Sequence, residues 1–194
     1  MTGSARRWTH SALFGALWGG AEATVGTVLK ASGLPLSGLV MASIALVCLL
    51  TLRRLEPRRG VLLTAGAAAA LIKTFTLGGL YPGPVLAILL EAGMLELAFL
   101  VLRGWGAAVV GGAMVFAAAP VQMVLMIRIV AGRDAATALA GGARAVLGGL
   151  GLPGTSPREL LAGAAILTGL AGAAVGAWAW SLGGRVVQRV RGTG

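Results

Sequence analysis

Six apolar runs, each long enough to cross a bilayer as a helix, dominate the sequence. They cover residues 10–29, 35–52, 60–77, 82–102, 106–131 and 158–182. A transmembrane helix needs about 20 predominantly apolar residues. The whole chain is 57% hydrophobic and 11% charged, whereas a soluble domain carries about 25% charged residues. The sequence therefore predicts an all-α polytopic membrane protein, with a single transmembrane domain over residues 1–194.

The links between these runs predict how the helices follow one another. Short links join the first five runs, which suits antiparallel neighbours. The link over 132–157 is longer, and Asp134 can cap a short helix or re-entrant element lying over one membrane face. The string Ser156-Pro157-Arg158-Glu159 has the pattern of a capping box with proline at the first helical position. It predicts the start of the last helix.

The basic residues predict the orientation. With the N-terminus inside, ten arginines fall on the inner face, four arginines and lysines fall on the outer face, and Lys73 and Arg128 lie within spans. Basic residues favour the cytoplasmic side, so we expect both termini inside and the 132–157 link outside, in a bacterial inner membrane. Four of the five tryptophans would lie at the inner interface, as in an aromatic belt.

In a soluble protein, a net charge of +10 would suggest binding to nucleic acid. The arginines cluster at the ends of apolar runs and form no basic stripe with interleaved aromatics. We therefore expect no nucleic-acid partner. Membrane lipids with anionic headgroups are the expected partners of these arginines.

Five ionisable side chains lie inside the apolar runs. They are Glu22, Lys73, Glu91, Glu96 and Arg128. Each would cost about 2.5–3.5 kcal/mol at the centre of a bilayer, so each must face another charge, water or a ligand. All except Glu96 fall in the outer half of the predicted topology, on four different helices, and they are predicted to line an outward pocket. Glu96 is turned by about 140° from Glu91, and we expect it to hold helices together or to face the cytoplasmic side.

The four outer charges could also have simpler roles than lining a pocket. Lys73 and Arg128 can extend to the outer interface. Glu22 and Glu91 are shorter and deeper, and their simpler role is a structural ion pair or hydrogen bond between helices.

Three further side chains are candidates for orienting a ligand. Trp18 lies one turn before Glu22 on the same helical face, as a stacking wall for a flat or cationic ligand or as ordinary packing. Tyr81, in the third link, is placed to close over the pocket or to anchor the outer interface. Gln122 follows Pro120, which can kink the fifth helix and expose polar groups.

Small residues mark surfaces for close helix approach. Ala12 and Ala16 belong to a strip on the first helix, turned by about 100° from the face of Trp18 and Glu22. Gly15 with Gly19, and Gly172 with Gly176, have the small-xxx-small spacing of helix contacts.

The sequence lacks the residues that several kinds of intramembrane enzyme site require. His10 precedes the first run, Cys48 is the sole cysteine and Asp134 the sole aspartate. A serine–histidine site, an aspartyl dyad and a His/Cys metal cluster therefore lack their members. We expect no enzyme activity, no cofactor and no metal.

In length, helix number and orientation the chain resembles the membrane-embedded S-components of energy-coupling factor (ECF) importers of vitamins and micronutrients. That resemblance implies a small polar substrate bound near the outer face, and outer loops that cover it. It also implies docking of an Ala-xxx-Ala strip, matched here by Ala12 and Ala16, to a transmembrane coupling subunit that works with ATPase subunits. The chain departs from the family in its short first outer loop, Lys30–Pro35, and in lacking a histidine at position 2. It carries no residue string typical of biotin, thiamine, riboflavin or cobalt/nickel binders.

Two other functions fit the same residues. In a stand-alone secondary transporter, Glu22 or Glu91 would carry a proton. In a membrane subunit without a transport role, the charges would hold the helices together.

Overall fold

The computed structural model describes residues 3–32, 37–76, 82–130 and 156–192, together with a few positions between 132 and 142. Six long helices account for nearly all of these residues. They are α1 (Gly3–Ala31), α2 (Ser37–Leu55), α3 (Val61–Thr76), α4 (Pro82–Val101), α5 (Gly104–Val130) and α7 (Pro157–Gly192). No strand occurs in the described part of the chain, so the all-α prediction is confirmed there.

Five of these helices, α1, α2, α4, α5 and α7, are long and apolar enough to cross a membrane. This is the pattern of a multi-pass membrane protein. α3 is apolar but has 16 residues, which rise about 24 Å against a hydrocarbon core of about 30 Å. Six spans therefore stay a prediction, with α3 as the helix that decides the number.

The beginning of α7 confirms the predicted capping box. The backbone N–H of Ser156 donates to Glu159 Oε2 at 2.6 Å, and the N–H of Glu159 donates to Ser156 Oγ at 3.3 Å. The helix then continues to Gly192, well past the apolar run that was predicted to end at 182. Hydropathy marks the length of a span, and a helix can run on beyond it where its arginines reach water.

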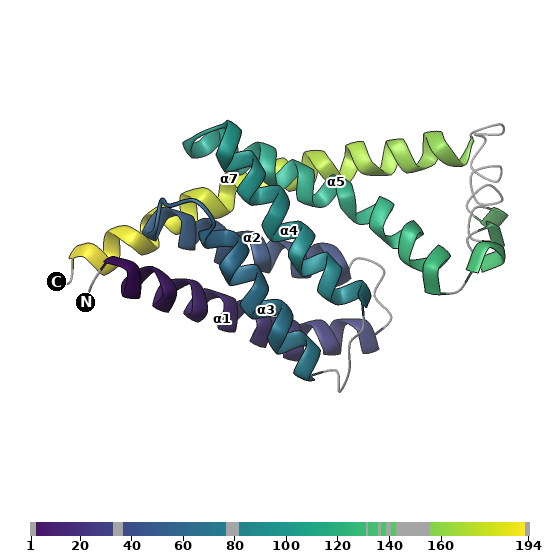
Figure 1. Cartoon of the computed structure of the whole chain (residues 1–194). Helices are drawn as coiled ribbons and strands as arrows, with labels where there is room; N and C mark the ends of the chain where they lie inside the picture. Colours follow the sequence, from purple (N-terminus) through teal and green to yellow (C-terminus); the bar gives the residue numbers. More distant parts are fainter. Residues whose placement is uncertain are drawn as a thin grey trace.

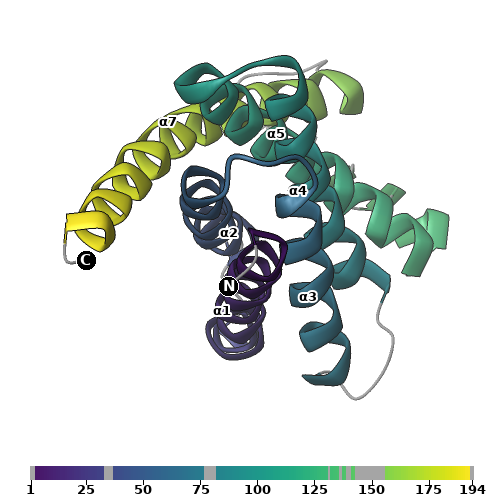
Figure 2. The same cartoon turned by 60° about the vertical axis from the view of Figure 1, so that its left-hand side comes forward.

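The helices run alternately in opposite directions, so the bundle has two distinct ends (Figure 1). Both chain termini, the α2–α3 link and the α4–α5 link lie at one end, which we call the terminal end. The opposite end, where α1, α3 and α5 finish, we call the loop end. Figures 1 and 2 show α5 beside α7, and α2 between α1 and α7.

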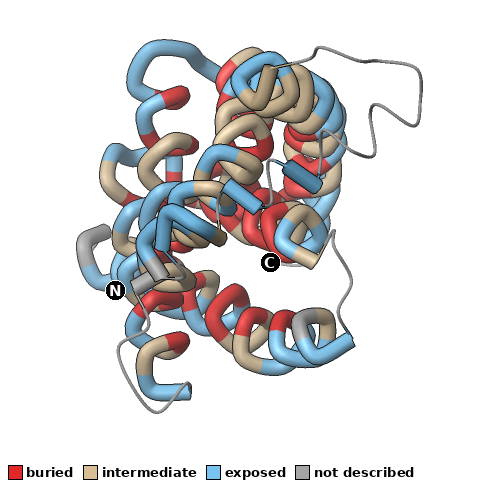
Figure 3. Tube along the Cα trace, turned by 90° about the vertical axis from the view of Figure 1, so that its right-hand side faces the viewer, coloured by how far each residue is buried: buried red, intermediate tan, exposed pale blue. Residues whose placement is uncertain are grey.

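Buried and exposed residues alternate along the helices (Figure 3), as expected where each helix packs one side against its neighbours. The core is built mostly from leucines and alanines of α2, α3 and α4, including Leu46, Leu49, Leu62 and Leu95. Large apolar side chains such as Leu71, Phe75 and Leu167 are exposed on the outer surface, as lipid-facing positions are in a membrane protein.

Two seams of small residues bring helix backbones into direct contact. In the seam between α5 and α7, a side chain on Gly172 would collide with the backbone of Gly112 and with Phe116. In the seam between α1 and α3, a Cβ on Gly15 would lie 2.6 Å from the carbonyl oxygen of Ala65. Both glycine pairs with small-xxx-small spacing therefore pack inside the bundle, as such pairs do in membranes.

The α5–α7 seam makes a direct prediction about stability. Gly172→Val should lower the free energy of unfolding by about 1–3 kcal/mol or more, because overpacking forces the two backbones apart. Gly163→Val is the matched control on the same helix, since a Cβ there meets nothing within 4 Å. Unfolding midpoints of the two variants in detergent measure the difference, and equal midpoints would contradict the seam.

Candidate functional site

The α1–α3 seam brings Glu22 and Lys73 together near the loop end of the bundle. Lys73 Nζ lies 3.2 Å from Glu22 Oε2 and donates a hydrogen bond of 2.6 Å to the backbone carbonyl of Glu22. The lysine residue is 1% exposed and the glutamate 8%. Lys73 therefore does not extend to the interface. It forms a buried ion pair that links α3 to α1.

Glu91 of α4 adds a second acid to this pair. Its carboxylate interacts electrostatically with that of Glu22. The Oε2 atom of Glu91 is buried, and it has no hydrogen-bond partner among the described residues. Leaving a buried carboxylate oxygen unpaired is costly. We call Glu22, Lys73 and Glu91 the three-charge cluster; with all three ionised it carries a net charge of −1.

Trp18 lies one helical turn before Glu22 on α1, and two residues absent from the sequence predictions border this cluster. Trp18 is fully buried, and its indole N–H has no partner in the described part of the protein. Gly26, one turn after Glu22, is so close that a Cβ there would lie 3.2 Å from Glu22 Oε2 and 3.7 Å from Lys73 Nζ. The same position is 3.6 Å from Met41 Sδ of α2. The spacing of Gly26 from Glu22 was the available signal for it, whereas nothing in the sequence indicated Met41.

No hydrogen bond or ion pair joins the other described residues predicted for the site to this cluster. Arg128 is exposed near the end of α5, and it forms no ion pair with the three-charge cluster. Gln122 is half-buried on the same helix. Tyr81 falls outside the described residues. Ala12 and Ala16 are exposed on α1, so they are free to contact a partner.

Glu96 belongs to a separate site at the terminal end. Its carboxylate accepts hydrogen bonds from the backbone N–H groups of Gly60 (2.9 Å) and Leu62 (3.1 Å), and it lies 3.5 Å from Arg53 Nη1. The first N–H groups of a helix lack partners within the helix and carry partial positive charge. Glu96 of α4 therefore caps α3 from outside, and this capping role joins two neighbouring helices. Gly60 has a φ of 81°, a conformation that favours glycine.

A second buried carboxylate at this end was missed in the sequence. Glu56, in the α2–α3 link, is 2% exposed and accepts from Arg6 Nε at 2.9 Å, with His10 Nδ1 at 3.0 Å. In the sequence, the spacing of Arg6 and His10, one helical turn apart on α1, could have indicated that both contact the same acidic side chain. Burial by itself would raise the pKa of Glu56, but the hydrogen bonds and positive charges of these two partners outweigh it and hold the pKa below its ordinary value.

The described residues contain no group of three or more His, Cys, Asp and Glu side chains that could hold a metal ion. Comparison of the chain with family models, with curated proteins and with solved structures finds no match. The functional argument therefore depends on the geometry of the three-charge cluster and on the residues around it.

Removing the charge of Glu96 should destabilise the protein. Glu96→Gln keeps one acceptor oxygen but leaves Arg53 without its carboxylate and one α3 N–H group without its acceptor. The expected loss is about 1.5–3 kcal/mol, as for a hydrogen bond to a charged group. Glu159→Gln is the matched control, since Glu159 also accepts a hydrogen bond at a helix start but is exposed. Equal unfolding midpoints for the two variants would show that burial of the Glu96 cap does not matter.

The lowered pKa of Glu56 makes stability depend on pH. Because the folded state favours the ionised carboxylate, its contribution is present above the ordinary pKa of 4.5 and is lost as the pH falls through the lower folded value. The unfolding midpoint of the natural chain should therefore drop over this acidic range more than that of Glu56→Gln. Parallel pH profiles would show that Glu56 is not responsible.

Proposed function

We propose that this protein is the substrate-binding membrane subunit of an importer, and that it binds a small polar molecule at the three-charge cluster. Ionisable side chains inside a membrane are costly and usually mark a substrate or ion pathway. Glu22, Lys73 and Glu91 come from three different helices, and the Glu22–Lys73 pair lies near the loop end of the bundle.

The buried, unpartnered oxygen of Glu91 carries this proposal. The charges of Glu22 and Lys73 neutralise each other, and their pair is sufficient to explain how α1 is held to α3. Glu91, in contrast, is not stabilised by lying near a second carboxylate. With all three groups ionised, the cluster's net charge of −1 would be neutralised by a ligand bearing an ammonium or another cationic donor. Since Arg128 forms no ion pair with the cluster, a cationic or zwitterionic substrate suits the site better than an anionic one. The indole N–H of Trp18 is available to orient it.

The topology proposed for this subunit has six crossings, with both termini and the terminal end in the cytoplasm of a bacterial cell. The distribution of the arginines supports this orientation. It makes the loop end the outer side, so the three-charge cluster would be reached from outside the cell. α5 ends and α7 begins on that side, and we propose that the 132–157 link between them covers the site.

The resemblance to ECF S-components supplies the proposed mode of transport. Such a subunit depends on a transmembrane coupling subunit and on ATPase subunits for energy. Ala12 and Ala16, with exposed Leu13 and Leu17 beside them, form a small-residue and apolar surface on α1. A coupling helix could approach this surface closely.

Substitution of Glu91 tests the site. Glu91→Gln should weaken substrate binding and uptake about tenfold or more, because it removes a charge-assisted contact. It should leave the unfolding midpoint unchanged or raised, because it removes an unpaired charge. Arg128→Gln is the control for a charge outside the cluster. Binding is followed by native mass spectrometry of protein carrying its co-purified ligand, and uptake in cells supplied with a coupling module.

A purified protein that carries no ligand and supports no uptake with such a module would refute the proposal. If Glu22→Gln and Glu91→Gln changed only stability, the charges would be adhesive and the protein a subunit without a transport role.

The same oxygen of Glu91 favours one other function, that of a stand-alone proton-coupled transporter. A buried carboxylate without a partner can take up and release a proton as its surroundings change. In that case uptake would need no ATPase, would collapse with the proton gradient and would be lost in Glu91→Gln. Measurement of uptake with and without ATPase subunits separates the two functions.

A further inference from the structure

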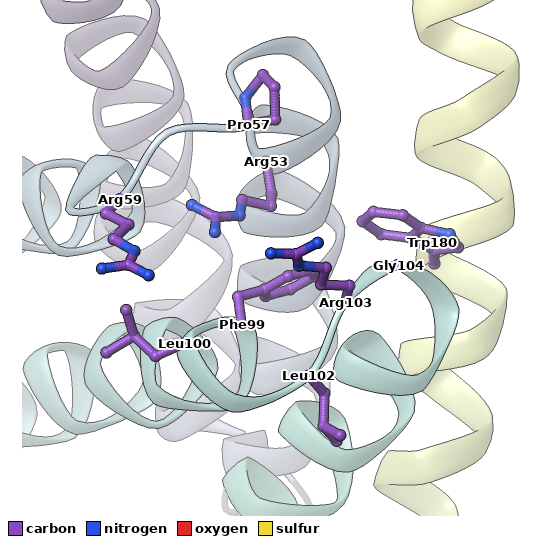
Figure 4. A pocket seen from close by; sticks show the side chains of 9 residues that line it. All are labelled: Arg53, Pro57, Arg59, Phe99, Leu100, Leu102, Arg103, Gly104 and Trp180. Carbon is purple, nitrogen blue, oxygen red and sulfur yellow. The ribbon is translucent and has the colours of Figure 1, made fainter.

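A second polar site lies at the terminal end, remote from the three-charge cluster. A hollow of about 400 Å³ opens there between α2, the α2–α3 link, the end of α4, the α4–α5 link and α7. Arg53, Arg59 and Arg103 line it, and Figure 4 shows their guanidinium groups turned toward the same space. They come from three separate segments of the chain.

Positive charge in this hollow is only partly balanced. Arg53 is 8% exposed and lies 3.5 Å from Glu96 Oε1, but that carboxylate is shared with two backbone N–H groups of α3. The guanidinium of Arg53 also interacts unfavourably with that of Arg59. Like charges held together at a partly buried site are relieved by an anion. Arginine is the side chain best suited to bind phosphate, because its planar fork can donate two hydrogen bonds at once.

Aromatic rings contact the guanidinium groups of Arg53 and of its neighbour Arg54. The Cζ atom of Arg53 lies 4.9 Å from the ring centroid of Phe99, and that of neighbouring Arg54 lies 4.0 Å from the ring centroid of Trp180. The two rings contact each other, with centroids 5.6 Å apart. Arg53 also donates to the backbone carbonyl of Arg58. Arg53 is therefore held in place before any ligand binds, which reduces the entropic cost of binding.

From this geometry we propose that the hollow binds a phosphate group with uncompensated negative charge. The group belongs either to the headgroup of an anionic phospholipid or to a small soluble phosphate ester. Leu100 and Leu102, which are 47% and 38% exposed, form an apolar edge on the same hollow. That edge would receive the acyl chain of a lipid whose phosphate lies among the arginines.

Arg59 and Arg103 are the residues to change, because both are exposed and neither holds Glu96. The variant Arg59→Gln/Arg103→Gln removes two charges from the hollow. Arg7→Gln/Arg185→Gln removes two charges from the same end of the bundle without touching the hollow, and it is the matched control.

The test uses the full chain purified in a neutral detergent. One arm adds phosphatidylglycerol, with phosphatidylcholine as a lipid whose phosphate charge is compensated. The other arm adds inorganic phosphate or glycerol phosphate without anionic lipid. Binding is read from retained ligand in native mass spectrometry and from the rise in unfolding midpoint that a ligand of the folded state produces.

We expect phosphate-bearing ligand to bind the natural chain and the Arg7/Arg185 variant equally, and to bind the Arg59/Arg103 variant about tenfold or more weakly. A response to phosphatidylglycerol would assign the site to a lipid headgroup, and a response to the soluble compounds would assign it to a phosphate ester. The proposal is overturned if neither arm responds, if phosphatidylcholine binds as well as phosphatidylglycerol, or if both double variants bind alike.

Discussion

Charged side chains buried between apolar helices constrain this protein more than any other feature, because each must find a partner inside the bundle. Glu96 accepts a hydrogen bond at the start of α3 and lies beside Arg53. Glu56 pairs with Arg6 and His10, and Lys73 pairs with Glu22. Each contact joins residues from different parts of the chain. The positions of α1 and α4 relative to α3 therefore depend on carboxylates as well as on apolar packing.

Small residues make these polar contacts possible. The glycines of α1 allow its backbone to touch α3, so that a lysine near the end of one helix reaches a glutamate in the middle of the other. In lipid, apolar side chains gain little by associating, and close backbone packing takes over their role. Glu91 is the exception in this arrangement, since packing brings it beside a like charge and supplies its Oε2 atom with no partner among the described residues.

The elements were easier to predict from the sequence than the contacts between them. Hydropathy placed α4 within a residue of its observed ends, and the Ser156–Glu159 pattern placed the start of α7, because both signals are local. The pairing of Glu56 with Arg6 and His10 depends on which way a link turns, which composition does not encode. Arg128 was predicted to share the depth of the cluster in the membrane, but depth says nothing about how a helix is rotated. In the structure Arg128 is exposed and forms no ion pair with the cluster.

The shortness of α3 has a consequence for the surrounding lipid. Leu63, Leu71 and Phe75 on this helix are exposed, while its 16 residues fall about 6 Å short of an ordinary hydrocarbon core. If α3 crosses the bilayer as the six-span topology predicts, thinning of the surrounding lipid is one way to match its length, and hydrophobic mismatch of this kind costs a fraction of a kcal/mol for each ångström. Acyl-chain length thus becomes a variable that acts on α3, the helix that carries Lys73.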